Sequence, residues 1–330
     1  MSNQENTGRI HEKSLMQEIR KNKRRVHFYD VIITGKCQKG EVKSSSPPPR
    51  SKRNFITEVL LPSFFIKRGG KKQQPIFPKL VGDQIAITWI GHASFLIQTA
   101  RHHLIIDPNW NNWVFVVKRL REAGMAIEDL PNIDLVLVTH AHFDHLSRRS
   151  LKKIAARQPI IVPQGVGNLV HDLGFERVHE MQWWESLTYK ELKITFTPAK
   201  HWGARVITDR FRGYGGFAIE YLGRVIYHCG DSAMFDGFQE IGKKLKPEIA
   251  LLPIGAYDPP SGRDHHMNPE QALEVFKTLG AKTFIPMHYG SYRMSYEPMH
   301  EPEQRLLSAA VELGAMNKIR FLIEGQPQVF

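Results

Sequence analysis

The sequence predicts an α/β (α+β) fold in which β-sheets are covered by helices on their outer faces. Three observations lead to this prediction. Hydrophobic residues make up 42% of the 330 residues, which is an ordinary share for a globular protein. No run of about 18 apolar residues occurs, which excludes a transmembrane helix. From residue 81 onward, short strand-like runs come first, and strand-like and helix-like segments then alternate.

The region from residue 81 opens with short apolar runs that favour strands, at 85–90, 94–99, 103–106 and 134–139. Apolar residues at helical spacing then alternate with further apolar runs. In chain order we predict helix 147–156, strand 160–162, helix 166–173, strands 192–197, 217–221 and 224–228, helix 235–245, strand 249–253, helix 269–279, strand 283–286, helix 302–313 and strand 318–322. Asn268 suits the cap of the helix that begins at Pro269, because its side chain can accept a backbone hydrogen bond.

The positive charge of the chain is confined to its first quarter. The formal net charge is +12, but residues 1–80 hold 18 Lys and Arg against 6 Asp and Glu, whereas residues 81–330 hold 27 of each sign. Because the basic excess lies outside the region with strand and helix patterns, it does not mark that region as a nucleic-acid binder, and no specific nucleic-acid partner is expected. We predict a basic, largely irregular extension over residues 1–80 and a folded domain over residues 81–330.

Three segments stand out within this extension. Residues 21–25 form a basic cluster, residues 44–49 form a linker of Ser and Pro, and residues 55–66 form an apolar stretch between basic pairs. The apolar stretch could lie on a membrane surface, with its cations on anionic headgroups. It could instead pack on the domain while its charges are solvated. Pro62 would interrupt an amphipathic helix, which favours packing, and peripheral membrane contact through residues 1–80 stays the alternative.

A cluster of histidines follows the apolar run at 134–139. Residues 139–145 read Thr-His-Ala-His-Phe-Asp-His, so three histidines and one aspartate fall within six residues. Imidazole and carboxylate are good ligands for zinc and similar ions. A strand that ends here would place them on a loop at its carboxyl edge. His140 and His142 can reach one ion, and Asp144 and His145 can turn towards a second.

This His-x-His-x-Asp-His motif resembles the signature of the metallo-β-lactamase superfamily. The resemblance implies a four-layer αβ/βα sandwich for residues 81–330, with one or two metal ions between the sheets. It also implies three later ligands, each after a strand-like run, which are His201 in Pro-Ala-Lys-His-Trp, Asp231 in Cys-Gly-Asp-Ser and His288 in Pro-Met-His-Tyr-Gly. One ion would be bound by His140, His142 and His201, the other by Asp144, His145 and His288, and Asp231 would bridge the two.

Further segments narrow the resemblance. Five of them, at 89–94, 106–108, 183–185, 253–257 and 266–270, are similar to the branch of N-acyl-phosphatidylethanolamine-hydrolysing phospholipase D, and the similarity spans about residues 81–300. This resemblance implies a substrate pocket that includes Tyr257, His266 and Tyr289. It implies catalytic roles for Asp144, Asp231 and His266.

Three other polar residues near these motifs have a structural alternative. Asp107 could orient a ligating histidine, or it could only cap the turn that follows it. His92 could line the metal cavity, although a buried structural role is favoured. His228 lies within a strand, has no place in the motif, and is expected to be structural.

The implied activity is that of a metal-dependent hydrolase. The first hypothesis is a phosphodiesterase of the phospholipase D type that acts on N-acyl-phosphatidylethanolamine-like lipids. A hydroxide that bridges two divalent ions would attack phosphorus, and the positive centre would suit an anionic ester. Zn²⁺ is the first choice for these ions, and Fe and Mn are the alternatives. The alternatives are a lactonase or other acyl hydrolase on the same ions, a mononuclear iron dioxygenase, and a nuclease. A non-catalytic binding module is disfavoured, because all seven implied ligands are present.

Cysteine content and the N-terminus indicate the compartment. The two cysteines, Cys37 and Cys229, exclude a disulfide scaffold and fit a reducing environment. The first 30 residues lack the pattern of a secretory signal. We therefore expect a cytoplasmic protein, and peripheral contact with the inner face of the membrane is a further possibility. The expected partner is a phospholipid or another phosphodiester, and no pattern in the chain sets an oligomeric state.

Overall fold

Two mixed β-sheets form the framework of the computed structural model, which describes residues 53–206 and 208–330. The basic cluster at 21–25 and the linker at 44–49 lie outside the described residues. The compact unit runs from Asn54 to Phe330. Residues 54–80 therefore belong to the same unit as the region with the histidine motif. No helix in the described part of the chain has the length and apolar character needed to cross a membrane.

The first sheet has the strand order β15-β1-β2-β3-β6-β7-β8. Its strands are β1 (Ile85–Gly91), β2 (Ser94–Thr99), β3 (His103–Ile106), β6 (Leu135–Leu137), β7 (Ile160–Pro163), β8 (Val178–Met181) and β15 (Pro327–Val329). Successive side chains of a strand point to opposite faces. Accordingly, Phe95 and Ile97 of β2 join one apolar cluster and Leu96 joins another. Both faces of this sheet are therefore covered.

The second sheet has the strand order β14-β13-β12-β11-β10-β9. Its strands are β9 (Ser186–Tyr189), β10 (Leu192–Thr197), β11 (Gly216–Tyr221), β12 (Arg224–His228), β13 (Ile249–Pro253) and β14 (Thr283–Met287). All five residues of β13 are buried, as expected for a central strand with both faces covered.

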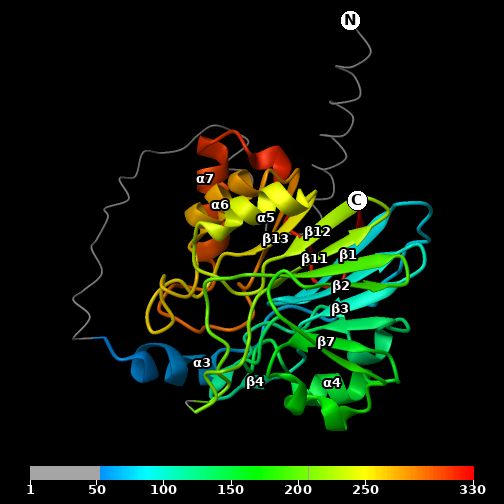
Figure 1. Ribbon diagram of the computed structural model, residues 1–330. Helices are drawn as coiled ribbons and strands as arrows, with labels where there is room; N and C mark the ends of the chain where they lie inside the picture. Colours follow the sequence, from blue (N-terminus) through cyan, green and yellow to red (C-terminus); the bar gives the residue numbers. More distant parts are fainter. Residues whose placement is uncertain (1–52, 207) are drawn as a thin grey trace, which may run out of the picture. The chain divides into compact units, whose positions relative to one another are not determined.

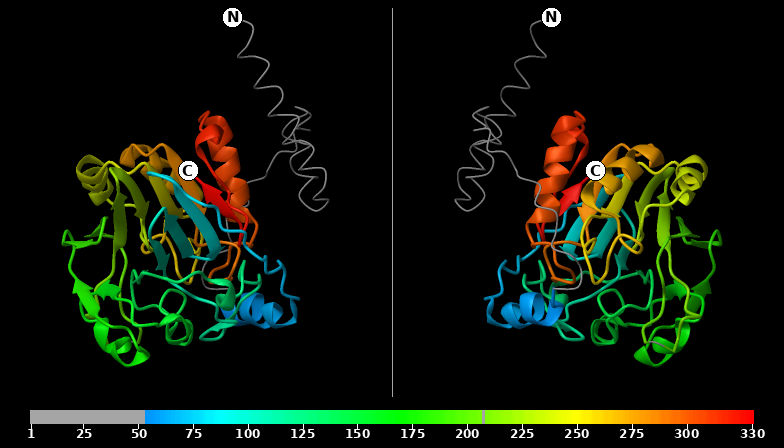
Figure 2. Two further views of the ribbon diagram at one scale, coloured as in Figure 1. Left: turned by 90° about the vertical axis from the view of Figure 1, so that its right-hand side faces the viewer. Right: turned by 90° about the vertical axis from the view of Figure 1, so that its left-hand side faces the viewer.

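Helices cover the outer faces of the two sheets and complete four layers. The helices α5 (Gly237–Leu245), α6 (Pro269–Leu279) and α7 (Glu301–Glu312) lie together over the second sheet, while α4 (Arg148–Ile154) lies beside β7 of the first (Figure 1). The views in Figure 2 show both sheets between these helices. The predicted cap of α6 is confirmed, because the Asn268 side chain accepts from the Gln271 backbone N–H at 2.9 Å. The predicted layered α/β sandwich is confirmed.

Strand direction brings several loops to one edge of each sheet. In the first sheet β3 and β6 are parallel, and β1 has the same direction because β2 is antiparallel to both of its neighbours. In the second sheet β12, β13 and β14 are parallel, and β10 shares their direction through the antiparallel β11. The loops that follow these strands carry every residue of the histidine motif and its three later partners.

Two predicted elements are wrong. The helix predicted at 166–173 is instead two 3₁₀ turns, Gly167–Leu169 and His171–Leu173. Glycine disfavours a helix, and the backbone N–H groups of Gly165 and Gly167 donate to the Glu180 carboxylate, at 3.0 and 2.7 Å. The strand predicted at 318–322 is reduced to one bridge between Phe284 and Ile319. The chain leaves the second sheet there and ends as β15, which pairs with β1 of the first sheet.

Other differences concern short or edge elements. The sequence did not predict β8 and β9, which are edge strands with mixed polar and apolar residues. Pro62 does not interrupt the helical segment, which runs through a π-helical turn, η2 (Ile56–Leu60), into α3 (Leu61–Phe65). Proline is accepted because it stands in the first turn of α3, where a missing N–H removes no α-helical hydrogen bond.

Candidate metal centre

The predicted ligands meet at the carboxyl ends of the strands. The loop after β6 carries residues 140–145, and the segments after β10, β12 and β14 carry His201, Asp231 and His288. Side chains from these loops, together with His92 from the turn between β1 and β2, form two groups of four residues, and within each group the ligand atoms lie within 4.8 Å of one another. The first group is His140, His142, His201 and Asp231, and the second is His92, Asp144, His145 and His288; all are buried except His142, which is partly buried. A smaller third group, Asp231, His266 and His288, overlaps both. Every residue predicted from the motif is therefore in one of the two groups.

Three imidazole nitrogens face one another in the first group. His142 Nδ1 lies 2.9 Å from His140 Nε2 and 3.2 Å from His201 Nε2. Burial lowers the pKa of all three rings, to about 4 for His142 and well below the usual value for the other two, so the rings are neutral at pH 7. Each neutral imidazole has one nitrogen without a proton, and three rings that face one another cannot donate a hydrogen bond to all of these nitrogens. A metal cation bound by the lone pairs of the unprotonated nitrogens would satisfy all three rings together.

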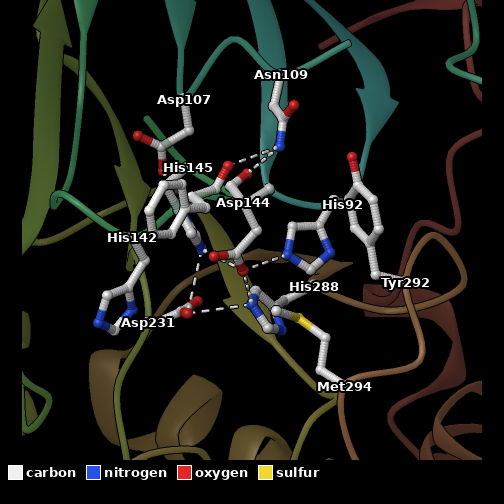
Figure 3. A network of polar contacts seen from close by, with 12 residues as sticks. His92, Asp107, Asn109, His142, Asp144, His145, Asp231, His288, Tyr292 and Met294 are labelled. Carbon is white, nitrogen blue, oxygen red and sulfur yellow. Dashed lines mark hydrogen bonds and ion pairs between the residues drawn. The ribbon is translucent and has the colours of Figure 1, made fainter. Parts of the chain in front are cut away.

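Asp144 organises the second group. Its Oδ2 lies 2.8 Å from His92 Nε2, 3.3 Å from His288 Nε2 and 3.4 Å from His145 Nε2 (Figure 3). Burial opposes ionisation of Asp144, but the neighbouring imidazoles, His145 first among them, hold its pKa well below the usual range. The buried carboxyl is therefore an anion, as a metal ligand must be.

Asp231 stands between the two groups. Its Oδ2 lies 3.1 Å from His145 Nε2 and from His288 Nε2, and 3.8 Å from His140 Nε2. Its Oδ1 is buried and has no hydrogen-bond partner among the described residues. Although burial disfavours the charge, His145 and His288 keep the pKa of Asp231 well below the usual range. One carboxylate is thus shared by both ligand groups.

Two histidines of the second group differ from those of the first in charge. Burial lowers the pKa of His145 and of His288, but the carboxylates of Asp231 and Asp144 outweigh it. The pKa of His288 is raised to about 9, and that of His145 is raised well above its usual value. These two cationic rings offset the two buried carboxylates. Binding of a divalent metal would displace their protons.

A second layer of hydrogen bonds fixes the ligands. Asp107 Oδ2 accepts from His145 Nδ1 at 2.7 Å and from the Thr139 hydroxyl at 2.6 Å. Asp107 therefore contacts a predicted ligand, as the first of its two alternatives requires. The Asn109 side-chain amide donates to the Asp144 carbonyl at 2.7 Å, and His201 Nδ1 donates to the His265 carbonyl at 3.0 Å. The second bond leaves His201 Nε2 free to face the centre.

The structure changes the interpretation of several other predicted residues. His92, expected to be structural, lies in the second ligand group at the turn between β1 and β2. His228 is structural as expected, because its Nε2 donates to the Ala93 carbonyl at 3.0 Å. His266 does reach the centre, with its Nδ1 4.0 Å from Asp231 Oδ2. Burial lowers the pKa of His266 to about 3, so its ring is neutral.

The two tyrosines expected in the substrate pocket each have a buried partner. The hydroxyl of Tyr257 donates to Glu301 of α7 at 2.8 Å, and the ring of Tyr289 stacks on Trp89 with centroids 5.0 Å apart. Both tyrosines are buried. Tyr289 also lines a cavity together with His288 of the second ligand group. The place of Tyr257 and Tyr289 in a substrate pocket therefore stays a prediction.

The side chains of the centre fit metal ions. The set consists of imidazoles and anionic carboxylates, the donors that zinc and similar ions prefer, and the two cationic imidazoles of His145 and His288 become ligands when they lose a proton. Several buried atoms within the described residues lack a hydrogen-bond partner, among them His142 Nε2, Asp231 Oδ1 and His266 Nδ1. Unpaired buried polar atoms cost free energy, and ligation would remove that cost for the atoms that bind.

We predict that Asp107→Asn weakens metal binding by about 10-fold to 100-fold, because an amide cannot hold both Thr139 and His145 as the carboxylate does. Competition with a coloured chelator for zinc would measure the affinity. The matched control is Asp172→Asn, which removes an exposed ion pair with Arg148 and is expected to leave affinity unchanged. Equal affinity of both variants would contradict this role of Asp107.

We also predict that the metal-free chain loses stability as the pH falls from about 7 to about 5. Six buried histidines have a lowered pKa in the folded chain, which are His92, His140, His142, His201, His228 and His266. Below about pH 6.5 the unfolded chain protonates these rings and the folded chain does not, so each contributes up to about 1.4 kcal/mol of lost stability per pH unit.

The groups whose pKa is shifted in the opposite direction do not cancel this loss of stability. His145 and His288, whose pKa is raised, are protonated in both states below about pH 6.5, so their contribution is complete there and is lost only as the pH rises through the folded pKa. Asp144 and Asp231 keep their contribution until the pH falls through their lowered pKa. Urea unfolding of chelator-treated protein at several pH values measures the effect, and a pH-independent midpoint would refute it.

Comparison with known proteins agrees with this geometry. A family model described as the beta-lactamase superfamily domain matches residues 102–289. The chain is 34% identical over 241 residues to N-acyl-phosphatidylethanolamine-hydrolyzing phospholipase D 1 of Caenorhabditis elegans, an alignment that covers 66% of this chain and 68% of the relative. A mitochondrial relative of the same description in Saccharomyces cerevisiae is 30% identical, with 66% of this chain and 50% of the relative covered.

Bacterial and archaeal proteins show the same relationship. A metal-dependent hydrolase of Koribacter versatilis is 31% identical over 217 residues, which cover 63% of this chain and 85% of the relative. Among solved structures, a metallo hydrolase of the archaeon Ignicoccus hospitalis superposes with a TM-score of 0.59 at 26% identity, over 75% of this chain and 98% of that one. The family model spans more than half of the chain, and we conclude that the chain belongs to the metallo-β-lactamase superfamily and is a metal-dependent hydrolase similar to the N-acyl-phosphatidylethanolamine-hydrolysing phospholipases D.

Proposed function

We propose that the chain is a phosphodiesterase of the phospholipase D type that hydrolyses N-acyl-phosphatidylethanolamine-like lipids with two divalent metal ions, zinc being expected first. One observation carries the proposal, which is that the single carboxylate of Asp231 stands between two groups of buried ligands. The nematode and yeast relatives, whose names state this reaction, support the choice of substrate.

The ligand groups assign the holders of the two ions. His140, His142 and His201 would hold one ion, Asp144, His145 and His288 would hold the other, and Asp231 would contact both. Bound divalent ions supply a water of lowered pKa and positive charge for the oxygens of the phosphate ester. The three buried carboxylates at the centre, those of Asp107, Asp144 and Asp231, carry less charge than two divalent ions would bring, so the loaded centre would be positive and would suit an anionic diester.

Asp231 and His266 are the groups that would handle the water and the substrate. The buried Asp231 Oδ1 has no partner among the described residues, so it can accept a hydrogen bond from the attacking water and take up its proton. His266 is neutral and its ring faces the centre, so it can hydrogen-bond a phosphoryl oxygen. The water oxygen would bond to phosphorus, the bond from phosphorus to the N-acylethanolamine oxygen would break, and the proton would end on that leaving oxygen.

Two aromatic side chains beside the ligands suit a lipid substrate. The side chain of Trp202 is 47% exposed, and its ring lies 4.6 Å from that of His142. Phe143 is half-buried beneath the Arg205 guanidinium, which lies 3.9 Å from its ring centroid. Arg205 also donates to the backbone carbonyls of Ala141 and Leu146, so it ties down both ends of the ligand loop. Acyl chains could rest on these rings while the phosphate reaches the ions.

The test is hydrolysis of N-acyl-phosphatidylethanolamine in mixed micelles by the metal-loaded full chain. We expect release of phosphatidic acid, measured by mass spectrometry, and we expect a chelator to abolish it. Asp231→Asn should lower kcat by at least about 100-fold, because the amide cannot take up the proton. Asp172→Asn, at an exposed ion pair, is the control and should keep full activity.

Two results would contradict the proposal. One is a metal-loaded chain that releases no phosphatidic acid but hydrolyses lactones, which would identify an acyl hydrolase on the same ligands. The other is full turnover by Asp231→Asn, which would remove this carboxylate from the chemistry.

A further inference from the structure

The helical segment at the start of the described chain presents large apolar side chains to solvent. Segment η2 continues directly into α3, and these two turns bury Val59 and Ser63 on one side. On the other side Phe64, Phe65 and Ile66 are exposed, and Phe65 is 89% exposed. Single exposed apolar residues are common, but consecutive aromatic and aliphatic side chains on one turn indicate a surface for interaction.

A hairpin extends this surface. Strands β4 (Trp113–Val114) and β5 (Val117–Lys118) are joined by a tip of two exposed residues, Phe115 and Val116, and Phe115 is 78% exposed. The rings of Phe64 and Trp113 lie 5.0 Å apart, and α3 and β4 are neighbours in Figure 1. The Lys118 ammonium donates to the carbonyls of Phe64 and Ile66, at 2.9 and 2.8 Å.

We call these six side chains the apolar face, namely Phe64, Phe65, Ile66, Trp113, Phe115 and Val116. The bonds from Lys118 and the ring contact hold the helical segment and the hairpin together as one surface. A rigid surface of this kind loses little conformational freedom when it binds.

The apolar face reaches the ligand loop of the metal centre. The ring of Phe115 lies 6.0 Å from that of Phe143. Phe143 stands in the sequence between His142 and Asp144, one residue from each ligand group. Whatever binds the apolar face is therefore brought close to the loop that carries residues 140–145.

The stretch of sequence that contains and follows α3 carries cations only. Between Glu58 and Asp83 the sequence has no acidic residue and has five cations, Lys67, Arg68, Lys71, Lys72 and Lys79. Lys67, Lys71 and Lys72 are exposed, and Arg68 pairs with Glu122 at 2.8 Å. An apolar surface bordered by exposed lysines is complementary to a bilayer with anionic headgroups, in which apolar side chains enter the interface and cations stay at the headgroups.

We propose that the apolar face docks on the surface of an anionic lipid bilayer and holds the metal centre against it. Burial of the face, rather than charge alone, would fix where the bilayer contacts the protein, because Phe65 and Phe115 are the most exposed of its six side chains. The purpose of the docking, delivery of a phospholipid to the centre, rests on the proposed phospholipase function. The docking itself needs no turnover and is measured separately.

The experiment is co-sedimentation of the full chain with vesicles of phosphatidylcholine that contain about one third phosphatidylglycerol. We expect binding that weakens at high salt and with vesicles of phosphatidylcholine alone. Phe65→Ser with Phe115→Ser should reduce binding at least about tenfold, because two buried aromatic rings are lost from the interface. Both side chains are exposed, so the fold should be kept, and circular dichroism would check it.

Two further variants make the result specific. Lys71→Glu with Lys72→Glu should weaken the preference for anionic vesicles. Val311→Ser with Leu313→Ser replaces exposed apolar residues at the end of α7 and should bind vesicles like the unmodified chain. Equal vesicle binding by the Phe65 and Phe115 double variant and the unmodified chain would overturn the proposal, and so would no vesicle binding by the unmodified chain.

The outcomes separate docking from chemistry. A chain that binds anionic vesicles through the apolar face but releases no phosphatidic acid would keep the docking surface and refute the phospholipase proposal. The opposite result is a chain that releases phosphatidic acid from micelles and whose Phe65 and Phe115 double variant binds vesicles as well as the unmodified chain does. That result would support the phospholipase proposal and refute the docking surface.

Discussion

The burial of two carboxylates among imidazole rings is the constraint on which the centre depends. Asp231 Oδ2 lies within 4.0 Å of a ring nitrogen of each of five histidines, His140, His145, His201, His266 and His288. Buried carboxylates are costly unless cations offset them, and in the metal-free chain the protons of His145 and His288 do so. Divalent ions can take over this role and use the neutral rings as ligands, so the folded chain is suited to exchange protons for metal.

The direction of the strands and the close approach of backbone segments bring the ligands together. The strands of both sheets run so that the loops that follow them meet, and little space is left between these loops where they meet. Gly230, which precedes Asp231, has a φ of +64°, a conformation that side chains disfavour. A Cβ on Gly255 would lie 2.3 Å from the His288 carbonyl oxygen, so only glycine allows that ligand to come this close to the loop after β13. The apolar face lies on the same molecule near one ligand loop, which gives the centre an approach from a lipid surface.

The predicted ligands came from the sequence, and the residues that support them did not. The resemblance to the superfamily implied the two groups of ligands, and the position of each ligand after an apolar run agreed with it, because strand ends in such sheets share an edge. The positions of Asn109 and Arg205 could not be predicted, since their contacts to the ligand loop cross long stretches of sequence and have no local pattern. The contact of His92 with Asp144 could not be predicted either, because the turn between β1 and β2 shows nothing of the distance between the two residues. The helical segment through Pro62 and the short hairpin likewise form through tertiary contacts.

The number of metal ions per chain tests the account most directly. Elemental analysis of the purified, zinc-loaded full chain should give about two ions per chain, and Asp231→Ala should lower the number, because both ligand groups lose their common carboxylate. X-ray absorption at the zinc edge on the same samples should show imidazole and carboxylate ligands. About one ion per chain, unchanged in Asp231→Ala, would contradict a centre in which Asp231 joins two ligand groups.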